Sequence, residues 1–414
     1  MNQKQLLILL VLVAVVGGAA LVLFKHGQSS WQTAASGAGQ KLLGDFPVNN
    51  VGQIDISQGT NAVKLVKTND LWRVSQRSDY PANYPQISEF LIKAQDLKIV
   101  QTLKAGASQW PRLALVPGPG TNAALVVDFK DQAGKPIKTL LLGKQHFKKS
   151  NRPSPTGEMD DAGWPDGRYV KVGANSEDIA VISDALANIE PKADQWLNKD
   201  FFKADKIQEI AVAFPAATNS WKVSRETETG TDWKLADAKP GEQLDSSKTS
   251  GFSYSLSSPS FNDVLSPDTK PETAGLDKPT VITLGTFDHF TYTLTVGQKT
   301  NENYPLTVAV AAEIPKERVA GKDEKAEDKA RLDKEFKESQ KKLEDKLAQE
   351  KSCEKWVYLV SGWTLEPLLK ERAQLMVEKK EEPKKDDASS TNAAAAPKLE
   401  TATPKAAETN APTE

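Results

Sequence analysis

The chain has 414 residues, 39% of them hydrophobic and 26% charged, a length that accommodates two domains and accessory segments. Its formal net charge of -2 argues against a nucleic-acid-binding protein, because neutralising phosphates requires a basic face. A single cysteine, Cys353, excludes an internal disulfide and a cysteine-based metal cluster. Because the three histidines are also far apart in the sequence, we expect no metal and no cofactor.

An apolar run of 19 residues without a charge begins at Leu6 and ends at Phe24. As a helix it would span roughly 28 Å, close to the thickness of the hydrocarbon core of a bilayer. We therefore expect residues 1–26 to form a transmembrane helix that anchors the protein in the cytoplasmic membrane. The alternative is a cleaved signal peptide, which usually has a shorter apolar region and a small-x-small cleavage site.

The rest of the chain is expected outside the cytoplasm. An N-terminal anchor with a short cytoplasmic stub usually exports the chain on its C-terminal side, and a lone cysteine suits an oxidising compartment. This predicts a single-pass protein of the cell inner membrane whose bulk is periplasmic or extracytoplasmic. Residues 27–44 are rich in Ser, Gly, Ala and Gln, which predicts a flexible linker.

A first module is expected over residues 45–202. It opens with three short strand-like runs and continues with a helix, whose apolar residues at i, i+3, i+4, i+7 and i+10 begin at Ile87. Two hairpins and a further helix over residues 183–189 complete it. The expected strands lie at 51–56, 62–66, 71–74, 124–129, 137–142, 168–172 and 179–182.

Residues 203–376 repeat this order. Trp72 and Trp233 open the third run of each copy, which favours a core position for both. The counterpart of the first helix, residues 244–256, is Ser-rich and contains Gly251, so its helix should be weaker. Such self-similarity predicts an α+β protein of two tandem homologous modules, each a mostly antiparallel sheet with covering helices.

A long charged insertion, residues 314–354, separates the last two strands of the second module. Leu332, Phe336, Leu343 and Leu347 fall on one narrow stripe at helical spacing, and no Gly or Pro interrupts residues 322–354. This predicts a helix of about 30 residues, roughly 45 Å long. The stripe is either the contact of a coiled coil with a protein partner or one side of a solvated single helix, because sustained heptads are absent.

The ends of this insertion should meet, because paired strands lie about 4.8 Å apart. A single straight helix cannot bring them together. A helical hairpin, an extended segment near residues 315–321 that runs back along the helix, or looser strand pairing would each resolve the conflict. We favour a projecting arm with a return path. Residues 377–414 lack aromatic residues and have few apolar ones, which predicts a disordered tail.

Few residues point to chemistry. Glu158, Asp160, Asp161 and Asp166 crowd a Gly-containing loop, but their spacing does not match an EF-hand, which favours a solvated loop over a calcium site. His146 and His289 lack a nearby nucleophile motif and are interpreted as surface residues. Cys353 is either a free or buried thiol or an intermolecular cross-link. Trp110 and Trp164 lie in expected loops and are the better candidates for stacking contact with a ligand or partner.

The second copy contains the run Gly275-Leu276-Asp277-Lys278-Pro279, two alternating strands after it, Gly297 after the second of these strands, and the strand Val357-Tyr358-Leu359-Val360. With these features it resembles the DUF4340 family of bacterial membrane-anchored exported proteins. The resemblance covers about 51–202, where it is more divergent, and 206–370. It implies no catalytic residues. Some members look like neighbours of gliding-type ABC transport components, which implies an accessory role in the cell envelope.

These observations predict a non-enzymatic scaffold or accessory subunit with a protein partner in the cell envelope. The alternative is a module that binds a polysaccharide or peptide in a cleft between the two modules. An enzyme is the third possibility, and it would need convergent carboxylates that the sequence does not reveal.

Overall fold

The computed structural model describes residues 31–34, 37–120, 122–148, 164–319 and 324–378. Both sheets belong to one compact unit that ends at Met376. Within the described residues, no helix is both long enough and apolar enough to cross a membrane. The expected anchor between Leu6 and Phe24 lies outside the described residues. The same is true of the expected tail after its first two residues.

The first sheet has ten strands in the order β1-β6-β10-β9-β8-β7-β2-β3-β4-β5, and every neighbouring pair is antiparallel. Buried and less buried residues alternate along β7, as expected where one face of a strand packs on a core. The expected strands of this half are confirmed. Their bounds are β2 Gln53–Gln58, β3 Asn61–Thr68, β4 Leu71–Val74, β7 Leu125–Lys130, β8 Pro136–Lys148, β9 Trp164–Val172 and β10 Asp178–Ile182. Three further strands were not expected: β1 Trp31–Ala34, β5 Tyr80–Pro81 and β6 Ile99–Ala105.

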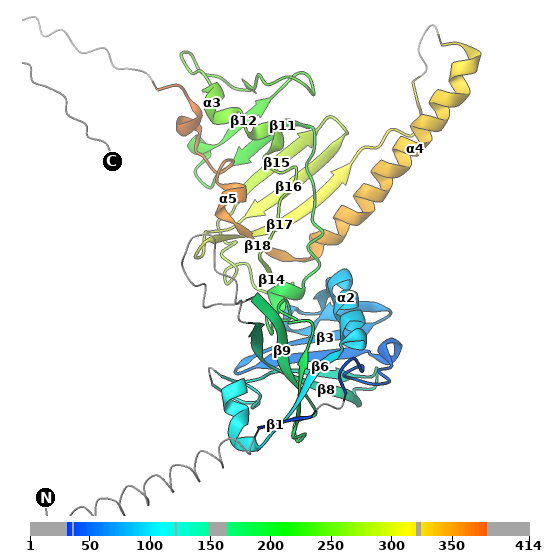
Figure 1. Ribbon diagram of the computed structural model, residues 1–414. Coiled ribbons are helices and arrows are strands. Elements are labelled where there is room, and N and C mark those ends of the chain that lie inside the picture. Colours follow the sequence, from blue (N-terminus) through cyan, green and yellow to red (C-terminus); the bar gives the residue numbers. More distant parts are fainter. Residues whose placement is uncertain (1–30, 35–36, 121, 149–163, 320–323, 379–414) are drawn as a thin grey trace, which may run out of the picture. The chain divides into compact units, whose positions relative to one another are not determined.

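The second sheet has eight strands, all antiparallel, in the order β13-β12-β11-β15-β16-β17-β18-β14 (Figure 1). The first sheet contains the same order as β4-β3-β2-β7-β8-β9-β10-β6. The central registers also correspond, because Ile54 pairs with Leu65 and Phe129 in the first sheet as Ile210 pairs with Val223 and Leu284 in the second. The bounds are β11 Ile207–Ala213, β12 Trp221–Ser224, β13 Lys234–Leu235, β14 Asp263–Leu265, β15 Thr280–Thr286, β16 Phe290–Val296, β17 Asn303–Ala312 and β18 Val357–Ser361.

Helix α2 (Tyr84–Asp96) covers one face of the first sheet, as the apolar periodicity predicts. The Asn83 side chain caps it by accepting a hydrogen bond from the backbone N–H of Gln86. The ring of its buried residue Phe90 lies 5.6 Å from that of Phe129 on β7. The counterpart in the second half is short, as expected: α3 (Ser246–Thr249) and the 3₁₀ helix η6 (Phe252–Tyr254).

The other helices of the described residues, apart from α4, are single turns or short 3₁₀ segments. They are η1 Val48–Asn50, η2 Ser75–Arg77, η3 Ala107–Leu113, η4 Ala193–Trp196, η5 Ala217–Asn219, η7 Ser352–Lys355, α5 Gly362–Leu365 and η8 Arg372–Leu375.

A matching turn precedes the central hairpin of each half. In the first, Ala114 N–H donates to the carbonyl of Pro111, and Leu115 N–H donates to that of Trp110. In the second, the N–H groups of Gly275 and Leu276 donate to carbonyls three and five residues back in the same way. Both pivot residues are left-handed, with φ of 53° at Ala114 and 71° at Gly275. This is the pattern that ends a helical turn, and glycine adopts it at least cost.

Most buried apolar side chains of the two sheets belong to one continuous hydrophobic cluster. Its aromatic junction is the ring of Tyr80, which packs edge-on against Trp356 at 4.9 Å and against Phe261 at 6.0 Å. Beside it, the Arg77 guanidinium forms two hydrogen bonds of 2.6 Å with the Asp263 carboxylate. Trp72 and Trp233 are both buried, which confirms the expected core position.

Two expectations are wrong. Residues 183–189 are not a helix: Leu186 has a φ of 45°, and the Asp184 side chain accepts a 2.8 Å hydrogen bond from the Leu186 N–H, a local bond that competes with helical pairing. Residues 27–44 are not a free linker in their described part. Strand β1 pairs with β6, Leu42 N–H donates to the Leu97 carbonyl at 2.7 Å, and Leu43 is 2% exposed, because this leucine pair packs on the core.

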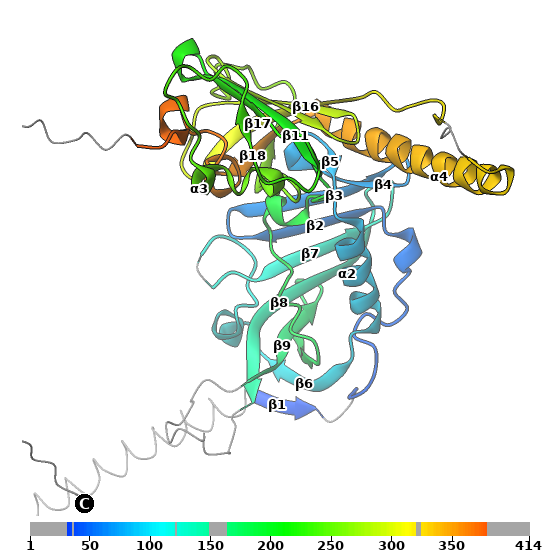
Figure 2. The same ribbon diagram turned by 90° about the horizontal axis from the view of Figure 1, so that it is seen from above.

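The charged insertion forms the helix α4 (Ala326–Lys351), 26 residues long and slightly shorter than expected (Figure 1). The segment after β17 runs back along this helix, and Arg318 Nε donates to the Asp333 carboxylate at 2.9 Å. Figure 2 shows this segment beside α4 from a second direction. The expected projecting arm with an extended return path is therefore confirmed, and the helical hairpin is not formed.

Candidate functional site

The base of the arm is bound to the second sheet. Leu343 and Leu347 pack against the hydrophobic core, so half of the expected contact stripe is used within the chain. Glu350 is 4% exposed, and its carboxyl group is hydrogen-bonded to the Lys203 N–H at 2.9 Å and to the Tyr292 hydroxyl at 2.8 Å. A buried carboxyl group with these partners fixes the orientation of the helix at its C-terminal end.

The outer part of the arm is tied together by one arginine. Arg318 forms a bidentate pair with Glu324 in addition to its bond with Asp333, and these two carboxylates raise the pKa of its guanidinium. Leu332 and Phe336, the other two residues of the expected stripe, are only half-buried. The arm is thus a helix with an antiparallel strap, and ion pairs rather than a core hold its outer end.

Trp110 packs within the protein. It lies in η3, donates its indole N–H to the Ala105 carbonyl at 2.9 Å, and carries the ammonium group of Lys171 3.0 Å from its ring centroid. It belongs to a small apolar cluster on the face of the first sheet opposite to the main core. Its ring does not offer the open stacking surface that sugar binding requires. Trp164 is the first residue of β9 and pairs with Lys148, and its side chain lies outside the described residues.

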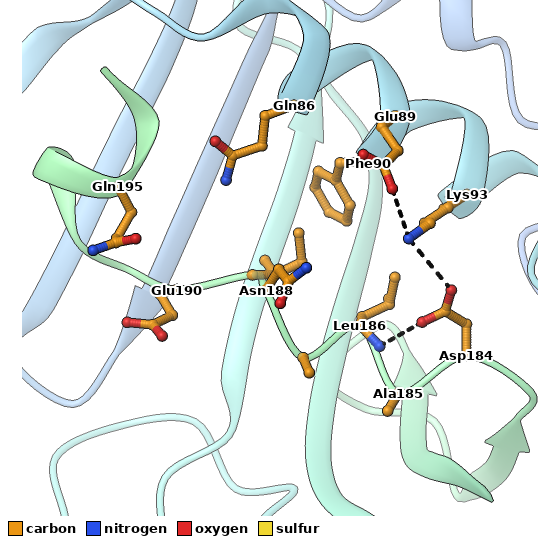
Figure 3. A pocket seen from close by; sticks show the side chains of 12 residues that line it. Gln86, Glu89, Phe90, Lys93, Asp184, Ala185, Leu186, Asn188, Glu190 and Gln195 are labelled. Atoms are coloured by element: carbon orange, nitrogen blue, oxygen red, sulfur yellow. Dashed lines mark hydrogen bonds and ion pairs between the residues drawn. The ribbon is translucent and has the colours of Figure 1, made fainter. Parts of the chain in front are cut away.

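A pocket of about 440 Å³ opens between α2 and the segment 184–190 (Figure 3). Figure 3 shows Gln86, Phe90 and Lys93 extending from α2, with Leu186 and Asn188 across from them. The volume falls within the range of small-molecule and peptide sites. Its lining residues are Gln86, Glu89, Phe90, Lys93, Gln195 and the seven residues from Asp184 to Glu190.

The wall formed by residues 184–190 is held by Arg168 on β9. The guanidinium donates to the carbonyls of Ala185 and Leu186 at 3.2 Å each and to that of Gly143 at 2.8 Å. Burial lowers the pKa of Arg168, in keeping with a cation that is surrounded by neutral carbonyls. On the other side, Lys93 lies 2.8 Å from Glu89 and 3.8 Å from Asp184, so one ammonium group joins the two walls.

Sequence reasoning missed this pocket. Its two walls come from α2 and from a segment about a hundred residues later that was expected to be helical. The only local signal was Asp184 two residues before a backbone N–H, the spacing at which an aspartate side chain closes an Asx turn.

The other candidate groups are dispersed. The Nδ1 atom of His146 lies 2.5 Å from the carboxylate of Asp166 on the neighbouring strand, and both side chains are about one-third exposed. His289 occupies the β15–β16 turn with a φ of 62°. Cys353 is buried, and burial raises the pKa of its thiol, which leaves it unreactive as a nucleophile. Among the described residues, no three His, Cys, Asp or Glu side chains form a metal-binding group. Glu158, Asp160 and Asp161 lie outside the described residues.

Residues 162–279 match the family profile of a domain of unknown function, DUF4340. The match contains the run Gly275-Leu276-Asp277-Lys278-Pro279, so the expected resemblance is confirmed over this segment. The matched segment extends from the first sheet into the second and ends at the residue before β15, and it coincides with neither of the expected copies. The chain matches no curated protein and no solved structure.

Proposed function

We propose that this protein is a non-enzymatic scaffold or accessory subunit that docks a protein partner of the cell envelope through α4. Its residues 162–279 match the DUF4340 profile. In this proposal the run between Leu6 and Phe24 anchors the protein in the inner membrane and the two sheets lie on the extracytoplasmic side. An accessory role beside an ABC-transport or gliding-type assembly is consistent with the family resemblance.

The observation that carries the proposal is the construction of the arm. Among the described residues, the part of α4 that contacts the second sheet is its C-terminal end, through Leu343, Lys346, Leu347 and Glu350. The remaining turns extend past the sheet, yet Arg318 ties them to a strap. The N-terminal turns of α4 are thus held in place although the hydrophobic core does not need them. Such a preorganised helix is suited to present its charged surface to a partner.

The two halves are proposed to be products of one duplication. Three features support this: the equal strand order, the equal central registers, and the matching left-handed turns at Ala114 and Gly275. Strand order and turn geometry are set by separate stretches of sequence, so they support the duplication separately.

Cross-linking of the membrane-embedded full-length protein tests the docking role. An arm-short variant replaces residues 316–341 by a four-residue Gly/Ser linker and keeps Leu343, Leu347 and Glu350 in place. We expect lysines on the exposed side of the arm, such as Lys334 and Lys341, to cross-link to one envelope protein, and that protein to be lost from the arm-short variant. An unchanged unfolding midpoint controls for folding. The proposal fails if both forms retain the same partner or if no cross-link starts on the arm.

Ligand binding is a second candidate function, and one specific observation favours it. The pocket between α2 and residues 184–190 is lined by the side-chain amides of Gln86 and Asn188, which have no hydrogen-bond partner among the described residues. Its position within the first half differs from the cleft between modules that the sequence suggested.

A further inference from the structure

We infer that the pocket between α2 and residues 184–190 binds an extended peptide segment that carries a basic side chain. This site is independent of the arm and therefore goes beyond the docking role proposed above. Four features of the pocket lead to this assignment: its unpaired amide groups, its buried floor, its charge and its fixed wall.

The hydrogen-bonding groups of the pocket match a peptide backbone. The side-chain amides of Gln86 and Asn188 have no partner in the described part of the chain, and that of Gln195 has only a 3.4 Å contact with Asp194. The backbone N–H and C=O of Ala187 and Asn188 are also unpaired among the described residues. A carboxamide donates and accepts at once, as a peptide group does, so these groups complement the alternating donors and acceptors of an extended chain.

The floor of the pocket favours a peptide over a carbohydrate. Phe90, Leu186 and Ile189 form it, and each is buried, so that little apolar surface is left for contact. The only aromatic residue in the lining is Phe90, which is 2% exposed. A sugar ring would find no aromatic face on which to stack, whereas one small or aliphatic peptide side chain can fill the remaining space.

The charge of the rim favours a basic ligand. The lining contains three carboxylates and one ammonium group. The carboxylates belong to Glu89, Asp184 and Glu190, and the ammonium group belongs to Lys93. Lys192 lies outside the lining and pairs with Glu190 at 2.7 Å. Asp194, in contact with Gln195, adds a fourth carboxylate, and Arg168 behind the wall adds a third cation. Four negative charges against three positive ones leave one negative charge, which a lysine or arginine of the ligand would neutralise.

The wall opposite α2 is rigid before any ligand arrives. Arg168 donates to two of its carbonyls, and the Asp184 side chain accepts the Leu186 N–H. Leu186 is held at a φ of 45°, a conformation that branched apolar residues rarely adopt and that persists only where surrounding contacts impose it. A wall fixed in this way loses little conformational entropy on binding. Because the pocket offers little apolar surface, a small entropy loss is important for its affinity for a ligand.

Fluorescence anisotropy on the full-length protein in detergent tests the inference with three labelled probes. These are a hexapeptide of alternating leucine and lysine, the same peptide with glutamate in place of lysine, and a neutral hexasaccharide of glucose. We expect saturable binding of the lysine peptide alone. Gln86→Ala and Asn188→Ala should each weaken it about fivefold, the effect of one neutral hydrogen bond.

Two further variants separate the site from its surroundings. Ala187→Trp should fill the pocket and abolish binding, whereas Gln208→Ala, which removes an exposed amide from β11, should leave the affinity unchanged. The arm-short variant should bind the lysine peptide as well as the wild type does, so that failure of this inference and failure of the docking role are distinguishable. Equal binding of the acidic peptide, binding of the hexasaccharide, no binding at all, or an affinity unaffected by Ala187→Trp would each overturn the inference.

Discussion

The hydroxyl oxygen of Tyr292 lies 2.8 Å from a carboxylate oxygen of Glu350 and 2.9 Å from the carbonyl oxygen of Lys203. A tyrosine hydroxyl has one proton and can donate to only one of these acceptors. With Glu350 ionised, Tyr292 donates to Glu350, and the Lys203 carbonyl keeps a 2.9 Å bond from the Lys346 ammonium group. With Glu350 protonated, we expect Glu350 to donate to Tyr292, which then donates to Lys203. Burial raises the pKa of the Glu350 carboxyl, which favours this protonated form.

The stability of the arm anchor should therefore fall as the pH rises. The folded protein holds the Glu350 proton more tightly than the unfolded chain, whose carboxyl has the ordinary pKa of 4.5. The stabilising contribution is complete below that pH and is lost as the pH rises through the folded-state pKa. Glu350→Gln keeps both contacts without a titrating group. We expect the free energy of unfolding of this variant, relative to wild type, to increase between these two pKa values in chemical denaturation.

Glu350→Ala is the control for the anchor itself. It leaves the Lys203 N–H without its acceptor at every pH, and it should lower the free energy of unfolding by about 1–3 kcal/mol. A difference between Glu350→Gln and wild type that does not change with pH would show that Glu350 titrates normally.

The two left-handed turns predict opposite effects of exchanging alanine and glycine. Ala114→Gly should raise the free energy of unfolding by up to about 1 kcal/mol, because glycine relieves the strain of a positive φ at some cost in unfolded-chain entropy. Gly275→Ala should lower it by about 1–2 kcal/mol, since its new methyl group meets only ordinary contacts and the backbone conformation alone is strained. Denaturant titration of both variants measures this, and effects of the same sign would refute the equivalence of the two turns.

Gly143 and Gly297 should tolerate no side chain. They follow equivalent strand positions, and a Cβ on Gly143 would collide with the Leu113 carbonyl oxygen, while one on Gly297 would lie 2.7 Å from that of Gly275. We expect each alanine variant to lose about 2–4 kcal/mol of stability through overpacking.

The matched control is Gly285→Ala on β15, where a Cβ would lie 3.6 Å from the nearest side chain, an ordinary contact. This variant should be neutral or slightly stabilising in the same thermal or chemical unfolding measurement. If Gly143→Ala were as stable as Gly285→Ala, the close approach of the Leu113 carbonyl to Gly143 would be incorrect.

Loss of the Arg318 clamp should loosen only the outer part of the arm. Arg318→Ala removes the bonds to Glu324 and Asp333 but leaves Leu343, Leu347 and Glu350 in place. Hydrogen exchange followed by mass spectrometry should show faster exchange of the N-terminal half of α4 and no change in its last two turns. Faster exchange along the whole helix, or in β16 and β17, would mean that the clamp also supports the sheet. Arg331→Ala, which removes pairs within the helix alone, is the matched control.

Local patterns were sufficient for most of the elements. The two strand-like runs of a hairpin, 124–129 and 137–142, predicted β7 and β8, and helical spacing from Ile87 predicted α2, because these signals come from neighbouring residues of one element. The arm was predictable for the same reason, and the need to return to the sheet indicated the strap. The failures lie where a side chain binds its own backbone, as at Asp184, or where a short apolar pair such as Leu42 and Leu43 is lost in a polar segment.

By itself, the sequence determined most of the strands, the helix α2 and the charged arm of this protein, since the burial of one face gives neighbouring residues a periodic pattern. It did not indicate the edge strands β1, β5 and β14 or the strand β6. Only the tertiary structure decided which polar groups from distant segments come together. The pocket joins Gln86 to Asn188, and the arm anchor joins Glu350 to Tyr292 and Lys203. Hydrogen bonds and pKa shifts of this kind depend on distances of about 3 Å between segments far apart in the chain, and such distances exist only after the chain has packed.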